Sequence, residues 1–348
     1  MNIILKNFFY KLSIKDYGNF LFLTGIFFLP STIFIGILFL FPASIIGCFL
    51  QKKSYLKDKW NYPLIVFGLL ILLSTFLQNY VLLNKYEEVW DPISSFIGLG
   101  NWLPFIWFFW AFQPYLNSYP KRRIFALILI SSTFPILVTG FGQYYFHWTG
   151  PFRTLNGLIT WYQRPIENPG GLSGLFNHQN YAGSWLNFIW PFCIALFLEK
   201  SKDIFRKIIA LNFLLAIGFA AFLTYSRNAW IGLITSIPII IEKKSITFFL
   251  PILTLILFIL FFTISPIFDG YLQTNIRSLL PEKILLEFSQ DGYVGLDTTR
   301  SIIYLSAIKL IKSSPIFGIG ASSFTPIFDL ETNFWKGHSH NLFLELSV

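Results

Sequence analysis

Charged residues and cysteines are both scarce in this 348-residue chain. Asp, Glu, Lys and Arg make up 12% of it, whereas a soluble domain carries about 25%. Cys48 and Cys193 are its two cysteines, and both lie inside apolar runs. These deficits argue against a soluble domain and exclude a disulfide-stapled fold or a thiolate metal site.

Apolar residues take the place of the missing charges. Hydrophobic residues form 54% of the chain, aromatic residues form 20%, and the mean hydropathy is +0.60. The formal charge of +9 does not indicate nucleic-acid binding, because 42 Phe and so few charges leave no broad basic surface. The composition therefore predicts a membrane protein, with membrane lipids around it and no nucleic-acid partner.

The apolar runs have the length of membrane-spanning helices. A bilayer core of about 30 Å needs roughly 20 apolar residues per helix. The block 20–50 is too long for one upright helix, and Pro30-Ser31 predicts a break that makes a two-helix hairpin. Further spans are expected near 62–83, 96–116, 124–146, 179–198, 206–224, 228–241 and 247–267.

The distribution of Lys and Arg predicts the orientation of these spans. With the hairpin counted as two crossings, the connections on the N-terminal side hold 16 Lys and Arg, and the opposite short connections hold 4. Positive residues accumulate in cytoplasmic loops. We therefore expect an all-α membrane protein with about nine transmembrane helices and a cytoplasmic N-terminus. Residues 1–267 would form the helical bundle, and 268–348 a large, partly helical region outside.

One helix is expected within that outer region. Residues 299–313 place Ile303, Ala307, Leu310 and Ile311 along one side. This pattern predicts a helix that lies either on the membrane surface or on the bundle.

Two outer motifs are candidates for binding an anion. Arg227 occupies a very short connection, Ser-Arg-Asn, between two spans, where a charge is costly unless it pairs or binds an anion. A snorkelling arginine at a helix end is the alternative interpretation.

The run 170–180 is rich in glycine and opens a span, and Asn177 and Asn180 could cap the helix start. A simple turn is the alternative there.

A third element combines Arg300, at the start of the outer helix, with a Pro-Gly turn over 314–320 and the run His338-Ser339-His340-Asn341. Two histidines at this spacing could bind a metal, but no carboxylate or cysteine stands beside them at ligand spacing. One neutral imidazole acting as a general base, with its neighbour in a structural role, fits better.

Taken in order, these motifs resemble the O-antigen ligase and polymerase superfamily of bacterial envelopes. The resemblance lies in Gly-Leu-Phe-Asn-His-Gln-Asn-Tyr-Ala-Gly before a span, Ser-Arg-Asn-Ala-Trp between spans, an Arg-initiated outer helix followed by Gly-Ile-Gly, and His-Ser-His-Asn. Together they cover roughly the second half of the chain.

The resemblance implies an inner-membrane glycosyltransferase. It would transfer sugar from an undecaprenyl-diphosphate-linked oligosaccharide to a glycan or lipid acceptor, such as lipopolysaccharide, on the periplasmic side. Arg227 and Arg300 would hold the diphosphate, and His340 would deprotonate the acceptor hydroxyl. Arg164, Asn177, Asn180, His338 and Asn341 are the further substrate-binding candidates. No metal or other cofactor is expected, and no Asp-x-Asp pair occurs in the sequence.

The sequence departs from the family pattern in two places. Many members carry an arginine just before the glycine-rich run, where this chain has Gly170, Gly171 and Leu172, so Arg164 would have to act from further back. The chain also ends seven residues after Asn341, where the family continues into further spans. A C-terminally truncated member is therefore expected, and the abundance of Phe, Ile, Asn and Lys fits a cyanobacterial one. An inactive remnant is one alternative. A transporter for a small anion such as bicarbonate is the other.

Overall fold

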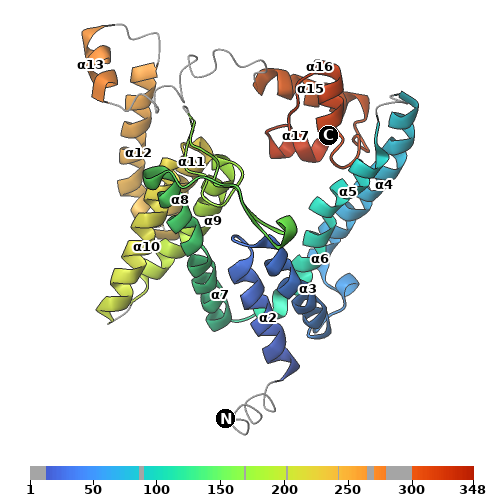
Figure 1. Cartoon of the computed structure of the whole chain (residues 1–348), viewed down its shortest axis with the longest axis horizontal. Helices are drawn as coiled ribbons and strands as arrows, with labels where there is room; N and C mark the ends of the chain where they lie inside the picture. Colours follow the sequence, from blue (N-terminus) through green and yellow to red (C-terminus); the bar gives the residue numbers. More distant parts are fainter. Residues whose placement is uncertain are drawn as a thin grey trace. The chain divides into compact units, whose positions relative to one another are not determined.

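The computed structural model describes residues 13–85, 90–167, 170–200, 203–241, 243–264, 270–279 and 300–348 (Figure 1). Within these ranges the regular structure is helical, apart from one two-stranded hairpin. The packing divides the chain into a first unit, Met1–Ser44 with Tyr115–Gly292, and a second unit, Ile45–Pro114 with Tyr293–Val348. Each unit is therefore assembled from segments that are distant in the sequence.

The first long apolar block forms two helices, α2 (Ile14–Phe28) and α3 (Ile33–Phe49). The chain turns between them at Pro30 and Ser31, so the predicted helix break is confirmed. A Cβ atom on Gly25 of α2 would lie 2.6 Å from Cγ of Leu40 in α3. The missing side chain therefore allows the two helices to pack closely.

The predicted span 124–146 is two helices rather than one. Helix α7 (Tyr119–Ser132) ends at Thr133, and α8 (Phe134–Phe146) follows directly. Pro135 lies in the first turn of α8, where its missing N–H is tolerated but a continuous helix would lose a hydrogen bond. The sequence prediction overlooked this interruption.

A short antiparallel hairpin follows α8. Strand β1 (Phe152–Thr154) pairs with β2 (Ile159–Trp161), so that Arg153 stands opposite Thr160. The indole Nε1 of Trp161 donates to the carbonyl of Ser31 at 2.8 Å. This bond fixes the hairpin to the turn between α2 and α3.

The remaining helices of the first unit are α9 (Gln179–Leu198), α10 (Ile204–Leu223), α11 (Arg227–Ile241), α12 (Lys243–Ile264) and α13 (Tyr271–Leu279). The first three agree with the predicted spans to within two residues. Helix α9 packs against both α10 and α11. Its buried side includes Leu186, Ile189 and Cys193, so Cys193 is a packing residue.

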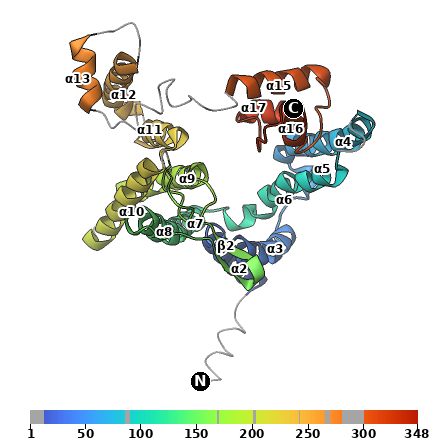
Figure 2. The same cartoon turned by 45° about the horizontal axis from the view of Figure 1, so that its top comes forward.

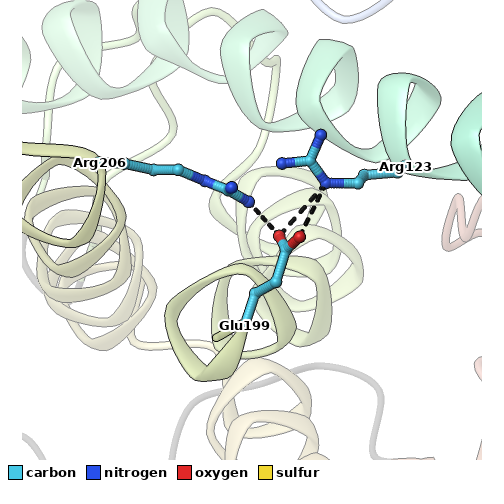
Figure 3. Close-up of polar contacts among 3 residues, drawn as sticks. All are labelled: Arg123, Glu199 and Arg206. Carbon is cyan, nitrogen blue, oxygen red and sulfur yellow. Dashed lines mark hydrogen bonds and ion pairs between the residues drawn. The ribbon is translucent and has the colours of Figure 1, made fainter. Parts of the chain in front are cut away.

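Three charged residues join α7, the end of α9 and the start of α10 (Figure 3). The Nε atom of Arg123 lies 3.0 Å from a carboxylate oxygen of Glu199, and Arg206 pairs with the other oxygen. The basic connections before α7 and between α9 and α10 therefore lie at the same end of the first unit. The predicted topology places these two connections on one side of the membrane.

In the second unit, α4 (Tyr62–Lys85) agrees with the predicted span 62–83. The predicted span 96–116 is divided into α5 (Pro92–Gly98), a 3₁₀ turn, and α6 (Leu103–Ala111). Pro104 has no N–H to donate to the carbonyl of Gly100, which favours a break at this point. The predicted span therefore contains a short break, although Pro92–Ala111 as a whole is long and apolar enough to cross a membrane.

Helices α15 (Arg300–Ser313), α16 (Phe324–Thr332) and α17 (Leu342–Ser347) complete the second unit, and Figure 2 shows the three together. The predicted helix is confirmed from Arg300, and Thr299 lies outside the described residues. Ile303, Ala307 and Leu310 are buried in a cluster with Leu82 of α4 and Trp90. The apolar side of α15 therefore packs on other helices of its unit, which is the second of the two predicted placements.

Five helical stretches among the described residues are long and apolar enough to cross a membrane. They are Lys59–Leu82, Pro92–Ala111, Tyr119–Phe146, Gln179–Leu198 and Ile204–Leu223. Helices α3 and α11 and the apolar part of α12 are shorter. The predicted class of helical membrane protein stands, whereas the count of nine spans is not confirmed.

Candidate functional site

The glycine-rich run before α9 is buried against the turn between α10 and α11. The amide of Leu172 donates to the carbonyl of Leu223 at 2.9 Å, and the Leu172 side chain is fully buried. A Cβ atom on Gly171 would lie 2.2 Å from the carbonyl oxygen of Thr224. Only glycine allows this contact, so the run is a packed element and not merely a surface turn.

The turn that carries Arg227 is held tightly from two sides. Thr224 and Ser226 are buried, and Tyr225 between them has a left-handed backbone with φ of 50°. On α9, a Cβ atom on Gly183 would lie 2.9 Å from Cβ of Ser226. Arg227 then opens α11 as a half-buried residue. The structure thus brings the first two sequence motifs together in one unit.

The side chain of Gln143, on α8, connects three segments of this site. Its Nε2 atom donates to the carbonyl of Arg164 at 2.6 Å and to the hydroxyl of Ser173 at 2.9 Å. Its Oε1 atom accepts from the amides of Ser173 and Gly174 at 2.9 and 2.8 Å. A buried side-chain amide is stable when its N–H donors and its carbonyl acceptor all have hydrogen-bond partners. Gln143 therefore fixes the backbone of Arg164 beside the glycine-rich run.

Arg164 and His178 are close enough to interact electrostatically. The pKa of His178 lies below its ordinary value, chiefly because surrounding protein atoms desolvate the ring and also because the Arg164 charge disfavours a second positive charge. Arg164 thus reaches the start of α9 from further back in the sequence. The role of Arg164 in place of the family arginine stays a prediction.

The cap of α9 is His178 and not one of the asparagines. Its Nδ1 atom accepts from the amide of Asn180 at 3.1 Å, and the helix begins at Gln179. The suggestion that Asn177 or Asn180 caps this helix was therefore wrong. Both asparagines are exposed at the mouth of the site, where their amides can bind a ligand.

Two tyrosines near Arg227 were missed from the sequence. The hydroxyls of Tyr225 and Tyr144 lie 3.2 Å apart, and burial together with this hydrogen bond raises the pKa of Tyr225 to about 12. Tyr225 therefore stays a neutral hydrogen-bonding group at physiological pH. Aromatic residues are so frequent in this chain that no local signal distinguished these two.

The second unit holds the other two motifs around one cavity of about 590 Å³. The turn 318–323 forms one wall, and Trp102, His338 and Glu345 contribute to the lining. Thr75 of α4 accepts from the amide of Ala321 at 3.1 Å, and Ser95 of α5 donates to the carbonyl of Ala321 at 2.9 Å. Helices α4 and α5 thus hold the turn that follows α15.

His338 and His340 form a pair with a defined geometry. The amide of His340 donates to Nδ1 of His338 at 3.0 Å, and the two ring centroids are 4.3 Å apart. Both side chains are exposed. Asn341 caps α17, because its Oδ1 atom accepts from the amide of Phe343 at 2.9 Å. Among the described residues, no group of three His, Cys, Asp or Glu side chains gathers around this pair or elsewhere.

The sequence-predicted site residues therefore fall into two groups. Arg164, Asn177, Asn180 and Arg227 belong to the first unit. His338, His340 and Asn341 lie in the second unit, where Arg300 begins α15 and its side chain lies outside the described part of the structure. The convergence of both groups on one ligand stays a prediction.

Comparison with known families relates the later part of the chain to a known family. Residues 211–348 match the family model of the O-antigen ligase domain, Wzy_C. The O-antigen ligase segment contains Arg227, Arg300 and the run 338–341, so the predicted resemblance to the superfamily is confirmed. No curated protein and no solved structure is significantly similar to the chain. Together with the apolar helices, the match over 211–348 supports a membrane protein of polysaccharide biosynthesis, and it does not favour the anion transporter.

Proposed function

We propose that this protein is a glycan polymerase or O-antigen ligase of the bacterial inner membrane. It transfers sugar from an undecaprenyl-diphosphate-linked donor to an acceptor hydroxyl on the periplasmic side. The observation that carries this proposal is the O-antigen ligase match over 211–348, because that segment contains both candidate arginines and the candidate base.

The arginines act on the leaving group. As the bond between the anomeric carbon and the diphosphate oxygen breaks, negative charge accumulates on the diphosphate. Arg227 and Arg300 supply permanent positive charge and forked N–H donors at that point. Arg164, held by Gln143 beside the start of α9, supplies a third cation on the donor side.

His340 acts on the acceptor. Its neutral imidazole takes the proton of the acceptor hydroxyl while the oxygen forms its bond to the anomeric carbon. The donor bond breaks on the opposite face, so the anomeric centre inverts and lipid-linked diphosphate departs. His338 has a positioning role, because its Nδ1 atom accepts the backbone N–H of His340. No step in this scheme requires a metal ion.

The test measures sugar transfer from a lipid-linked donor by the full chain in membranes, with Arg227→Ala and His340→Ala compared with the parent. Loss of a group that stabilises transition-state charge lowers the rate by about 10²–10³-fold. Arg122→Ala and His147→Asn are matched controls, because both residues are exposed and lie outside the proposed site. The controls should retain transfer.

Membrane insertion and protein amount are measured for every variant. Transfer at the parental rate by either test variant would remove that residue from the mechanism, and transfer by neither the parent nor the controls would contradict the proposed function.

A further inference from the structure

The cluster of Arg123, Glu199 and Arg206 takes no part in the proposed reaction, and it holds more positive than negative charge. Two guanidinium groups, one from α7 and one from the start of α10, share the single carboxylate at the end of α9 (Figure 3). The side chains of Arg123, Glu199 and Arg206 are only 33%, 27% and 30% exposed. A charge that is partly withdrawn from water is costly unless it is paired. The cluster is therefore suited to receive a second anion.

The orientation of Arg123 allows that second anion to bind. Its Nε atom donates to both carboxylate oxygens of Glu199, at 3.0 and 3.3 Å, and Arg206 binds the same carboxylate through Nη2. The two terminal nitrogens of Arg123 take no part in the bonds to Glu199 (Figure 3). A pair of terminal N–H donors of this kind fits two oxygens of one phosphate group.

The sequence around the cluster is strongly basic. Residues 119–123 and 199–207 hold seven Lys and Arg but two Asp and Glu. Both acidic groups already have partners, because Glu199 binds the two arginines and Asp203 caps α10. The Asp203 carboxylate accepts from the amides of Phe205 and Arg206 at 3.0 and 3.4 Å. This end of the first unit therefore attracts an anion from its surroundings.

The place of the cluster along the helices indicates the source of that anion. Three of the five helical stretches that are long enough to cross a membrane begin or end here, namely Tyr119–Phe146, Gln179–Leu198 and Ile204–Leu223. The ends of membrane-spanning helices lie at the level of the lipid headgroups. The anion within reach of the cluster is therefore the phosphate of a membrane lipid.

Exposed apolar side chains beside the cations favour a lipid over a soluble phosphate. Tyr119, Ile204 and Phe205 are 66%, 71% and 68% exposed. They occupy the first turns of α7 and α10, close in sequence to Arg123 and Arg206. The acyl chains of a lipid would cover these side chains, whereas a soluble phosphate would leave them in contact with water.

We propose that Arg123 and Arg206 form a binding site for an anionic phospholipid, with its phosphate on the two guanidinium groups and its acyl chains against Tyr119, Ile204 and Phe205. Basic pockets between membrane helices bind anionic headgroups in this way. The bound lipid joins α7 to α10 and, through Glu199, to the end of α9, so it stabilises the packing of these three helices. The site is independent of sugar transfer.

The experiment uses the full chain in an uncharged detergent and measures the unfolding midpoint during titration with dioleoyl phosphatidylglycerol. A ligand that binds only the folded state raises the midpoint as its concentration increases. Arg123→Gln and Arg206→Gln each remove one charged contact, so the apparent affinity should fall about tenfold. Unchanged affinity in both variants would overturn the proposal.

Arg122→Gln is the matched control. It removes the same charge at the adjacent position of α7, where the side chain is exposed and its Nη1 atom donates to the carbonyl of Leu116 at 3.1 Å. This variant should bind phosphatidylglycerol as the parent does. A loss of affinity equal to that of Arg123→Gln would indicate diffuse attraction to a basic surface and would also contradict the site.

Glu199→Gln separates a lipid site from a purely structural ion pair. Glutamine keeps an oxygen that accepts from the arginines but removes the anion that competes with lipid phosphate. The midpoint without lipid should fall, and phosphatidylglycerol should then raise it by more than it raises the parental midpoint. A structural ion pair predicts the same fall with no larger lipid effect, and that result would exclude the proposed site.

Arg123→Lys keeps the test decisive where the glutamine variants do not fold. It retains the charge beside Glu199 and loses the paired terminal N–H donors, so its affinity for phosphatidylglycerol should also be lower than the parental affinity. Parental affinity in Arg123→Lys would contradict the role of the forked donors.

Two further ligands test the identity of the occupant. Glycerol phosphate carries the charge without the acyl chains, and dioleoyl phosphatidylcholine carries the same chains without a net charge. Neither should raise the parental midpoint at concentrations at which phosphatidylglycerol does. An equal rise with glycerol phosphate would indicate a soluble-phosphate site, and an equal rise with phosphatidylcholine would indicate binding of the chains alone. Either result would overturn the proposal.

Discussion

His178 shows how one side chain can connect helix formation with the electrostatics of the site. Its Nδ1 atom caps α9, which requires the ring nitrogen to be an acceptor and therefore unprotonated. Desolvation of the ring and the nearby Arg164 charge both lower the pKa of His178. Protonation would remove the cap and add a second positive charge beside the arginine. The start of α9 is therefore sensitive to acid.

We expect the folded protein to lose stability as the pH falls below about 6.5, the ordinary histidine pKa. In this range the unfolded chain binds a proton that the folded chain takes up only at lower pH, so the free energy of unfolding decreases with decreasing pH. The decrease is complete below the lowered folded pKa. His178→Asn keeps an acceptor for the cap but cannot titrate.

The unfolding midpoint of detergent-solubilised protein, measured at several pH values between about 7.5 and 5, should therefore depend less on pH in His178→Asn than in the parent. His147→Asn serves as a control that retains His178 and should keep the parental slope. Identical pH dependence in the parent and His178→Asn would show that His178 does not titrate in this way.

The turn over 318–323 is the element that positions the second group of candidate residues. Thr75 and Ser95 bind both sides of Ala321, and Gly98 of α5 allows the turn to approach closely. A Cβ atom on Gly98 would lie 2.4 Å from Oγ of Ser322. Helix α5 and the turn therefore fit together only because position 98 has no side chain.

Gly98→Ala should disturb this fit, whereas Gly100→Ala should not. Nothing lies within 4 Å of a Cβ atom built on Gly100, and neither glycine has a positive φ. Overpacking at a buried contact costs about 1–3 kcal/mol, while alanine at an open helical position is neutral or slightly stabilising. The unfolding midpoint and the rate of sugar transfer should both fall in Gly98→Ala. Equal midpoints in the two variants would argue against the close fit.

Much of the whole-molecule architecture could be predicted because hydrophobic run length and proline position act locally. The predicted boundaries of α4, α9 and α11 agree closely with the structure, and so does the break at Pro30. The interruptions at Thr133 and at 99–101 were missed, because apolar composition stays uniform across a short break in a helix. The local sequence signal for such a break is a proline. Proline is also common in the first turn of a helix, so its presence alone does not identify a break inside a span.

The candidate site could be predicted only in part. The motif residues stand out because glycine, arginine and histidine are unusual in apolar surroundings. Gln143 could not be found this way, since its importance comes from contacts with Arg164 and Ser173, which are 21 and 30 residues away. The same holds for the Tyr144–Tyr225 pair. Contacts between distant segments depend on how helices pack, and a single sequence does not encode them in any local pattern.

The orientation of the first unit in the membrane provides the last prediction. The ion pairs of Glu199 place the basic connections before α7 and after α9 at one end, and the distribution of Lys and Arg predicts that this end is cytoplasmic.

In a background of Cys48→Ser and Cys193→Ala, a cysteine at Thr154 of the hairpin should react with a membrane-impermeant maleimide in intact spheroplasts. A cysteine at Lys200 should react only after permeabilisation, because the reagent cannot otherwise reach the cytoplasmic side. Labelling of Lys200→Cys from outside, with Thr154→Cys protected, would reverse the topology and place the candidate arginines on the wrong side for a periplasmic transferase.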